Sequence, residues 1–150
     1  MSGIVIRPAL LSERSSLEAL QWRASLANPG DRDSLLANPD AIVLPEQQIA
    51  DGDVFVAEDE GAIVGFATVL ARPDGDAELD ALFVEPSLWK RGVGRLLVEQ
   101  CADVARKRAS LILHVVGNPH AEGFYTSCGF RVTGTFETRF GTGLSMERAL

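Results

Sequence analysis

Two acidic residues, Glu78 and Asp80, alternate along a segment whose pattern predicts a strand, AELDALFVEP (77–86). Strict alternation along this strand divides the side chains between one face with Glu78, Asp80, Leu82 and Val84 and the other with Leu79, Ala81 and Phe83. Two acids on one face cost desolvation energy unless that face meets solvent or a substrate. A carboxylate in such a place can accept a proton from a reacting group. The alternative is a solvated pair of surface acids.

A glycine-containing loop follows this strand and precedes a predicted helix, with the sequence Lys90-Arg91-Gly92-Val93-Gly94. Unpaired backbone N–H groups and the helix dipole make a helix N-terminus favourable for an anion. Glycine lets the backbone approach a phosphate without a Cβ in the way. The alternative is a tight turn without a ligand. The Rossmann fingerprint fails because Leu97 occupies the third glycine position, and the chain has no GxxxxGK[ST] loop.

A second strand and loop end in the segment NPHAEGFYTSCGF (118–130), which contains the single tyrosine of the chain. Asn118 is a suitable N-cap for a helix that Pro119 opens. Tyr125 carries a phenol with an ordinary pKa of about 10, which can act as a general acid. The alternative is a ring packed beside Phe124 with its hydroxyl hydrogen-bonded.

The remaining candidates for metal or covalent chemistry are two histidines and two cysteines. We interpret His120 as a surface residue and His114 as a partly buried strand residue, because neither has a Ser or Cys partner in a nucleophile motif. Cys101 and Cys128 show no CxxC or Cys/His spacing, so we expect packing roles and neither a metal site nor a disulfide framework.

The composition is that of an ordinary globular protein with one domain spanning residues 1–150. The chain is 46% hydrophobic and 23% charged, and its net charge of −7 disfavours nucleic-acid binding, which needs a basic face. No apolar run approaches the ~20 residues of a membrane span. The N-terminus lacks the layout of a signal peptide, so the cytoplasm is the expected location.

The pattern of apolar and turn residues predicts the order β-α-α-β-β-β-α-β-α-β-β, a mixed sheet with helices on its faces. Strands are expected at 3–8, 53–58, 62–71, 77–85, 111–117, 130–137 and 143–149. The Ser15-to-Glu18 spacing predicts a capping box for a first helix that ends at 28–31. Short helices are expected at 33–38 and from Pro45 to Gly52, and longer ones at 92–108 and 119–127.

The segment 77–130 resembles the acetyl-CoA-binding half of the GNAT N-acetyltransferase superfamily. Its glycines match the family motif Q/R-x-x-G-x-G/A at Gly92 and Gly94, but position 89 is Trp where the family has Gln or Arg. The stretch 118–125 fits N-x-x-A-x-x-F/L-Y, and 128–130 fits the trailing x-G-F. The element order extends the resemblance to nearly the whole chain.

The resemblance implies an α/β GNAT fold and transfer of an acetyl group from acetyl-CoA directly to a primary amine. It implies catalytic roles for Tyr125 as acid and Glu78 as base, with Asp80 or water as alternatives. It implies cofactor contacts from Leu82, Phe83, Val84, Trp89, Lys90, Arg91, Gly92, Val93, Gly94, Arg95, Asn118 and Tyr125. An acyl-CoA-binding sensor without turnover is the alternative function.

The acceptor stays open between small molecules and peptides, and the resemblance leaves a homodimer open. Family acceptors are bound by the first helices and last strands, here about 22–52 and 134–146. Side chains there that could line an acceptor pocket are Trp22, Arg23, Arg32, Phe136, Arg139 and Phe140. No metal, nucleic-acid or membrane partner is expected, from the residue spacing, net charge and hydropathy given above.

Overall fold

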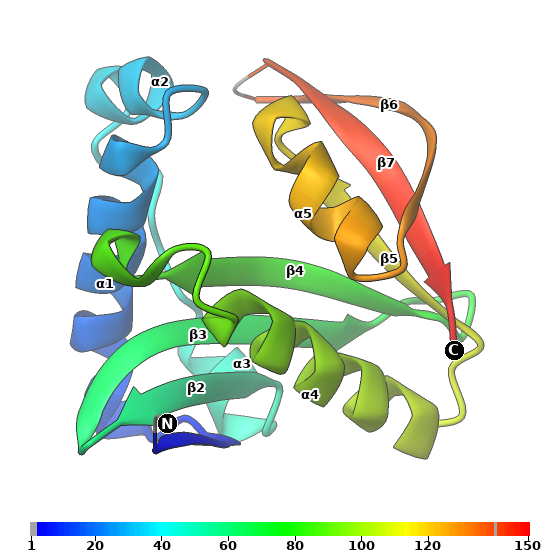
Figure 1. Cartoon of the computed structure of the whole chain (residues 1–150), viewed down its shortest axis with the longest axis horizontal. Helices are drawn as coiled ribbons and strands as arrows, with labels where there is room; N and C mark the ends of the chain where they lie inside the picture. Colours follow the sequence, from blue (N-terminus) through cyan, green and yellow to red (C-terminus); the bar gives the residue numbers. More distant parts are fainter. Residues whose placement is uncertain (1–2, 140) are drawn as a thin grey trace.

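The computed structural model describes residues 3–139 and 141–150, which form one seven-stranded sheet with helices on both faces (Figure 1). The strands follow the order β1-β2-β3-β4-β5-β7-β6 across the sheet. Their bounds are β1 Ile4–Pro8, β2 Val54–Asp59, β3 Ala62–Ala71, β4 Ala77–Val84, β5 Ile112–Gly117, β6 Arg131–Thr138 and β7 Gly141–Ala149. Neighbouring strands are antiparallel except β4 and β5, which are parallel.

Five α-helices and three short 3₁₀ turns are found among the described residues. The helices are α1 Arg14–Ala27, α2 Arg32–Ala37, α3 Glu46–Ala50, α4 Val93–Lys107 and α5 Glu122–Ser127. The 3₁₀ turns are η1 Leu11–Glu13, η2 Pro86–Leu88 and η3 Pro119–Ala121. The predicted mixed sheet and its order of strands and helices are confirmed. No helix in this described part of the chain is long and apolar enough to cross a membrane.

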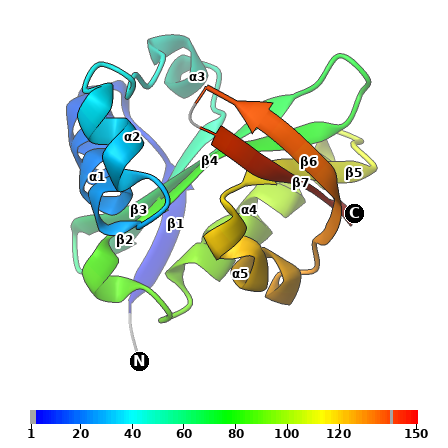
Figure 2. The same cartoon turned by 90° about the horizontal axis from the view of Figure 1, so that it is seen from above.

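The sheet carries a hydrophobic core on each face. On one face the apolar stripe of α4, including Leu97, Cys101 and Ala105, packs with Val69 and Leu79 of the central strands. On the other face Leu17 and Leu20 of α1 pack against Phe66 and Ala81. The two helix layers lie on opposite sides of the strands when the molecule is seen from above (Figure 2). Both cysteines are buried and free, as their predicted packing roles require.

The start of α1 differs from the predicted capping box. The helix begins at Arg14, and the preceding turn is closed by Glu13, whose Oε1 accepts from the Leu10 backbone N–H at 2.8 Å. Glu18 instead accepts from the Leu44 backbone N–H at 2.8 Å. The capping-box prediction was therefore wrong, because the Glu18 carboxylate binds the backbone of the segment between α2 and α3 instead of capping α1.

Strict alternation along β4 was also wrong. Thr68 of β3 pairs with Ala81 and Val69 pairs with Leu79, so Asp80 is an extra residue opposite no β3 partner. Such a β-bulge reverses the alternation on one side of it. Leu82 and Val84 therefore join Leu79 on the α4 face, whereas Glu78 joins Ala81 and Phe83 on the α1 face.

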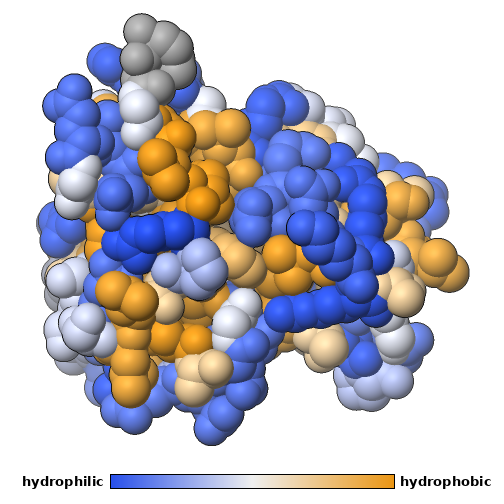
Figure 3. All heavy atoms as spheres, turned by 90° about the horizontal axis from the view of Figure 1, so that it is seen from below, coloured by the Kyte–Doolittle hydropathy of each residue, from blue (hydrophilic) through white to orange (hydrophobic). Residues whose placement is uncertain are grey.

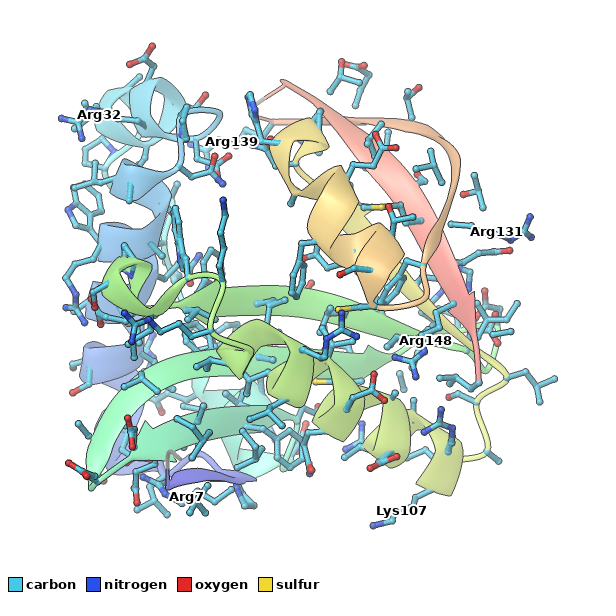
Figure 4. All side chains as sticks on the ribbon, viewed as in Figure 1. Arg7, Arg32, Lys107, Arg131, Arg139 and Arg148 are labelled. Atoms are coloured by element: carbon cyan, nitrogen blue, oxygen red, sulfur yellow. The ribbon has the colours of Figure 1, made fainter. Side chains whose placement is uncertain are left out.

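Ion pairs connect β1 and β7 to neighbouring parts of the fold. Arg148 of β7 reaches back to Glu99 of α4 at 2.6 Å and holds the pKa of that carboxyl below its ordinary range by direct hydrogen bonding (Figure 4). Arg7 of β1 contacts Glu13 at 2.7 Å and Glu58 at 2.9 Å. Seen from below the view of Figure 1, hydrophilic side chains lie between the apolar patches of this face (Figure 3).

Candidate active site

A cleft of about 1080 Å³ opens where the two parallel strands at the centre of the sheet separate. β4 and β5 pair over three residues only, from Ala77 with Leu113 to Leu79 with Val115. Beyond these pairs the carboxyl ends of both strands line the cleft, through residues 79–84 of β4 and 115–117 of β5. The separation leaves one edge of β4 without a neighbouring strand, although β3 still pairs with the other edge.

The free edge of β4 presents backbone groups to the cleft. The Glu85 N–H donates to the Val64 carbonyl at 2.8 Å, so Glu85 and Val64 form a hydrogen-bonded pair. In an antiparallel ladder such pairs alternate with pairs that exchange no hydrogen bonds, and the next pair, Val84 and Gly65, is of this second kind. The N–H and C=O of Val84 therefore point away from β3, and those of Leu82 do the same two residues earlier. Phe83 directs its backbone to β3 and contributes its side chain to the cleft.

Trp89 closes part of this edge. Its indole Nε1 donates to the Val84 carbonyl at 2.8 Å, while the ring lines the cleft and stays 41% exposed. The motif that this segment resembles has Gln or Arg at this position. Here the Trp89 indole takes the place of that polar side chain and connects the loop to the end of β4. The Leu82 N–H, the Leu82 C=O and the Val84 N–H remain for a ligand that pairs with β4.

The loop before α4 turns through two left-handed residues, Lys90 with φ 66° and Gly92 with φ 88°. A Cβ added at Gly92 would meet open space, so the backbone conformation is the constraint there. At Gly94 the added Cβ would lie 3.1 Å from Phe124 of α5, so this glycine also permits close packing of the two helices. Such turns direct consecutive N–H groups to one side, as in anion-binding loops.

The predicted loop residues divide between the cleft and the rest of the molecule. Trp89, Lys90, Gly92, Gly94 and Arg95 line the cleft. Arg95 is also fastened to the end of α5, because its Nη2 donates to the Ser127 carbonyl at 3.0 Å. Arg91 is exposed and outside the cleft lining, and Val93, the first residue of α4, is buried in the core.

Tyr125 projects from α5 into the same cleft and is 8% exposed. Its ring packs edge-on against Phe124 and Phe130, with centroids 5.1 and 5.6 Å away. On its other side it lies directly against the β5 backbone, where a Cβ on Gly117 would be 2.9 Å from the ring. Burial raises the pKa of the Tyr125 hydroxyl above its ordinary value, so it stays protonated at neutral pH.

The two acids of β4 occupy different surroundings. Glu78 is half-buried, and its Oε1 lies 3.6 Å from Arg72 Nη1 near the β3–β4 turn. It is not among the described residues that line the cleft, whereas Asp80 is. The Asp80 side chain keeps contact with solvent, yet the protein atoms around it raise the pKa of its carboxyl by partial desolvation. The bulge thus brings Asp80 rather than Glu78 to the cleft.

Asn118 links the two sides of the cleft. Its Oδ1 accepts from the His120 N–H at 2.9 Å, as an N-cap does. Its Nδ2 donates to Asp31 Oδ1 at 3.0 Å, which ties the α1–α2 loop to the β5–α5 loop. Gly30 permits this contact, since a Cβ there would lie 2.3 Å from Asn118 Nδ2. Sequence reasoning missed Asp31 as a site residue, because the two partners are 87 positions apart.

The acceptor-pocket residues proposed from sequence are absent from the cleft lining wherever the structure describes them. Arg23 is held by Glu85 through two hydrogen bonds of 2.9 and 2.8 Å. Arg32 lies on the outer side of α2, and Arg139 extends from the β6–β7 hairpin toward α2, where its Nη2 is 3.2 Å from Asn38 Oδ1 (Figure 4). Trp22 and Phe136 do not line the cleft, and Phe140 lies outside the described residues.

Comparison with known proteins identifies the family. The model of the acetyltransferase (GNAT) family matches residues 17–130, so the chain belongs to this family. A peptidyl-lysine N-acetyltransferase, YjaB, of Salmonella typhimurium is 30% identical over 135 residues, which cover 89% of this chain and 88% of the relative. Family membership and the similarity to a named N-acetyltransferase make the chain a transferase.

Solved structures share the fold. A GCN5-related N-acetyltransferase from Rhodopseudomonas palustris superposes with a TM-score of 0.78 at 23% identity, covering 100% of this chain and 98% of that one. The PaiA N-acetyltransferase from Thermoplasma acidophilum, solved in complex with coenzyme A, gives 0.77 at 18% identity and covers 99% of both chains. At these identities the likeness concerns the fold.

Proposed function

We propose that this protein transfers an acetyl group from acetyl-CoA directly to a primary amine. The observation that carries the proposal is the cleft, which joins a free β4 edge, a helix N-terminus and a buried tyrosine in one space. The edge offers N–H and C=O groups of Leu82 and Val84 to the amide-containing arm of the cofactor. The loop offers N–H groups and the charges of Lys90 and Arg95 to its phosphates.

The thioester of acetyl-CoA supplies the reactive acetyl group, and the side chains of the protein manage the protons. An alkylammonium has no lone pair, so it must lose a proton before it attacks, and a carboxylate can accept that proton directly or through water. Asp80 lies in the cleft with a raised pKa, which suits this role better than the ion-paired Glu78. Tyr125 stays protonated and can donate a hydrogen bond to the sulfur as it leaves.

Charged side chains of both signs line the cleft, which supports this assignment of substrates. Lys90 and Arg95 come from the loop before α4 and the start of α4, whereas Asp31 comes from the α1–α2 loop and Asp80 from β4. Anionic phosphates would be attracted to the two cations and a cationic amine to the two acids. The name of the Salmonella relative makes a lysine ε-amine in a peptide the first acceptor to test.

The test is amine-dependent release of CoA thiol from acetyl-CoA, measured beside acetyl-CoA binding by calorimetry. The proposal predicts binding and release of thiol that depends on a primary amine. Binding without thiol release, for a lysine peptide and for a panel of small primary amines, would favour the acyl-CoA sensor instead.

A further inference from the structure

A small side pocket opens off the cleft beneath the α1–α2 loop. Its volume is about 200 Å³, and it shares Ser25, Asp31 and Phe83 with the cleft. The shared residues place its mouth beside the β4 segment that the proposed function assigns to the cofactor arm. A group attached to the acceptor near its amine can therefore enter this pocket.

The wall of the pocket is mainly apolar. Leu35, Ala41, Ile42 and Phe83 supply its apolar side chains, and Leu35 is buried. The uncharged polar residues Gln21, Ser25 and Ser34 also line the pocket. The Phe83 ring is supported from behind by Phe66, with centroids 5.6 Å apart. An apolar cavity of about 150 Å³ is large enough to bind benzene. A pocket of this size and lining therefore fits an apolar group between isobutyl and phenyl in size.

The charge at the mouth restricts the group further. Asp31 is the one charged side chain among the described residues that line the pocket. Its Oδ1 accepts from the neutral Asn118 amide, and no described Lys or Arg forms an ion pair with it. A carboxylate beside the acceptor amine would meet this negative charge without a cation lining the pocket, whereas an ammonium at the mouth is attracted.

Resting on the proposed function, we propose that the acceptor is a primary amine with an uncharged apolar group of isobutyl to phenyl size. The group lies within a few bonds of the reacting nitrogen, and the neighbouring carbon bears no carboxylate. The apolar group fills the side pocket, and the amine lies at its mouth beside Asp31.

The wild-type test compares kcat/KM for four amines, corrected for the fraction of neutral amine at the assay pH. The amines are propylamine, 3-methylbutylamine, 2-phenylethylamine and phenylalanine. We expect 3-methylbutylamine and 2-phenylethylamine to exceed propylamine on the order of 10-fold, since each buried methylene contributes about fourfold. Phenylalanine, which adds only a carboxylate to 2-phenylethylamine, should react more slowly than that amine.

Variants locate the preference in the pocket. Ala41→Phe should fill the pocket and remove the preference, whereas the matched Val43→Phe, in the same loop but 62% exposed and outside the lining, should keep it. If Ala41→Phe does not fold, Ile42→Ala enlarges the pocket and should shift the preference toward 2-phenylethylamine over 3-methylbutylamine.

Equal kcat/KM for the three carboxylate-free amines would overturn the pocket assignment and leave the acetyltransferase proposal standing. A preference unchanged by both pocket variants would do the same. If no amine releases thiol, the acetyltransferase proposal fails, and this inference fails with it.

Discussion

Replacement of Tyr125 by Phe isolates the hydroxyl, because Phe keeps the edge-on packing against Phe124 and Phe130 at 5.1 and 5.6 Å. We expect the free energy of unfolding to change by less than about 1 kcal/mol, since the ring and its burial are retained. Any large change in turnover then reports on the chemistry of the hydroxyl rather than on folding.

The size of the catalytic effect follows from the raised pKa of Tyr125. An ordinary thiol has a pKa of about 8.5 and an ordinary phenol about 10, so complete proton transfer to the thiolate is uphill by about 2 kcal/mol or more. Burial of Tyr125 raises its pKa and increases this difference. The hydroxyl therefore stabilises the leaving sulfur mainly by hydrogen bonding, and its loss should lower kcat by about 10²-fold, the low end for acid catalysis.

The assay is thiol release at saturating acetyl-CoA and amine, with acetyl-CoA affinity measured by calorimetry. Tyr125→Phe should leave the affinity within about threefold of wild type, because an acid that acts on the departing sulfur contributes little to ground-state binding. If kcat does not change when the solvent viscosity is raised, the chemical step rather than product release limits the rate. A wild-type kcat under those conditions would refute the acid role.

Three further substitutions test the other parts of the site. The pH profile of kcat/KM should have an acidic limb above the ordinary carboxyl pKa, because the pKa of Asp80 is raised. Asp80→Asn should abolish this limb, whereas Glu78→Gln should keep it. The reverse result would return the role of base to Glu78. Gly117→Ala places a Cβ 2.9 Å from the Tyr125 ring. It should therefore lower the free energy of unfolding, measured by denaturant titration, by about 1–3 kcal/mol and also lower kcat. Wild-type stability would contradict the packing described. Lys90→Gly should relieve the strain of the left-handed backbone and raise the free energy of unfolding by about 0.5 kcal/mol, while weakening acetyl-CoA binding. Lys90→Ala should weaken binding without the gain in stability. If both variants bind acetyl-CoA as tightly as wild type, Lys90 is not part of the site.

Local patterns in the sequence were sufficient to predict the elements that form the cleft. The strand predicted at 77–85 and the helix predicted at 92–108 correspond to β4 and α4, and the glycine loop lies between them in one short segment. Tyr125 was predicted from its motif to act as a catalytic acid; the structure places it in the cleft lining, and its catalytic role stays a prediction.

The features that sequence could not supply depend on contacts between distant segments. The bulge at Asp80 arises from the register with β3, and it decides which acid reaches the cleft. The contact between Asp31 and Asn118 joins loops that are 87 positions apart. The side pocket depends on how α2 and the following loop pack beside Phe83. None of these has a local signal in composition or periodicity.

The most direct test of the central claim is whether acetyl transfer requires the amine to be present in the cleft with acetyl-CoA. Enzyme at a concentration comparable to acetyl-CoA is mixed rapidly with acetyl-CoA alone and with acetyl-CoA plus a reactive primary amine. Direct transfer predicts no burst of thiol without the amine, and equal amounts of thiol and acetylated amine when it is added. A stoichiometric burst of thiol before the amine is added, or release without an acetylated amine, would contradict the account.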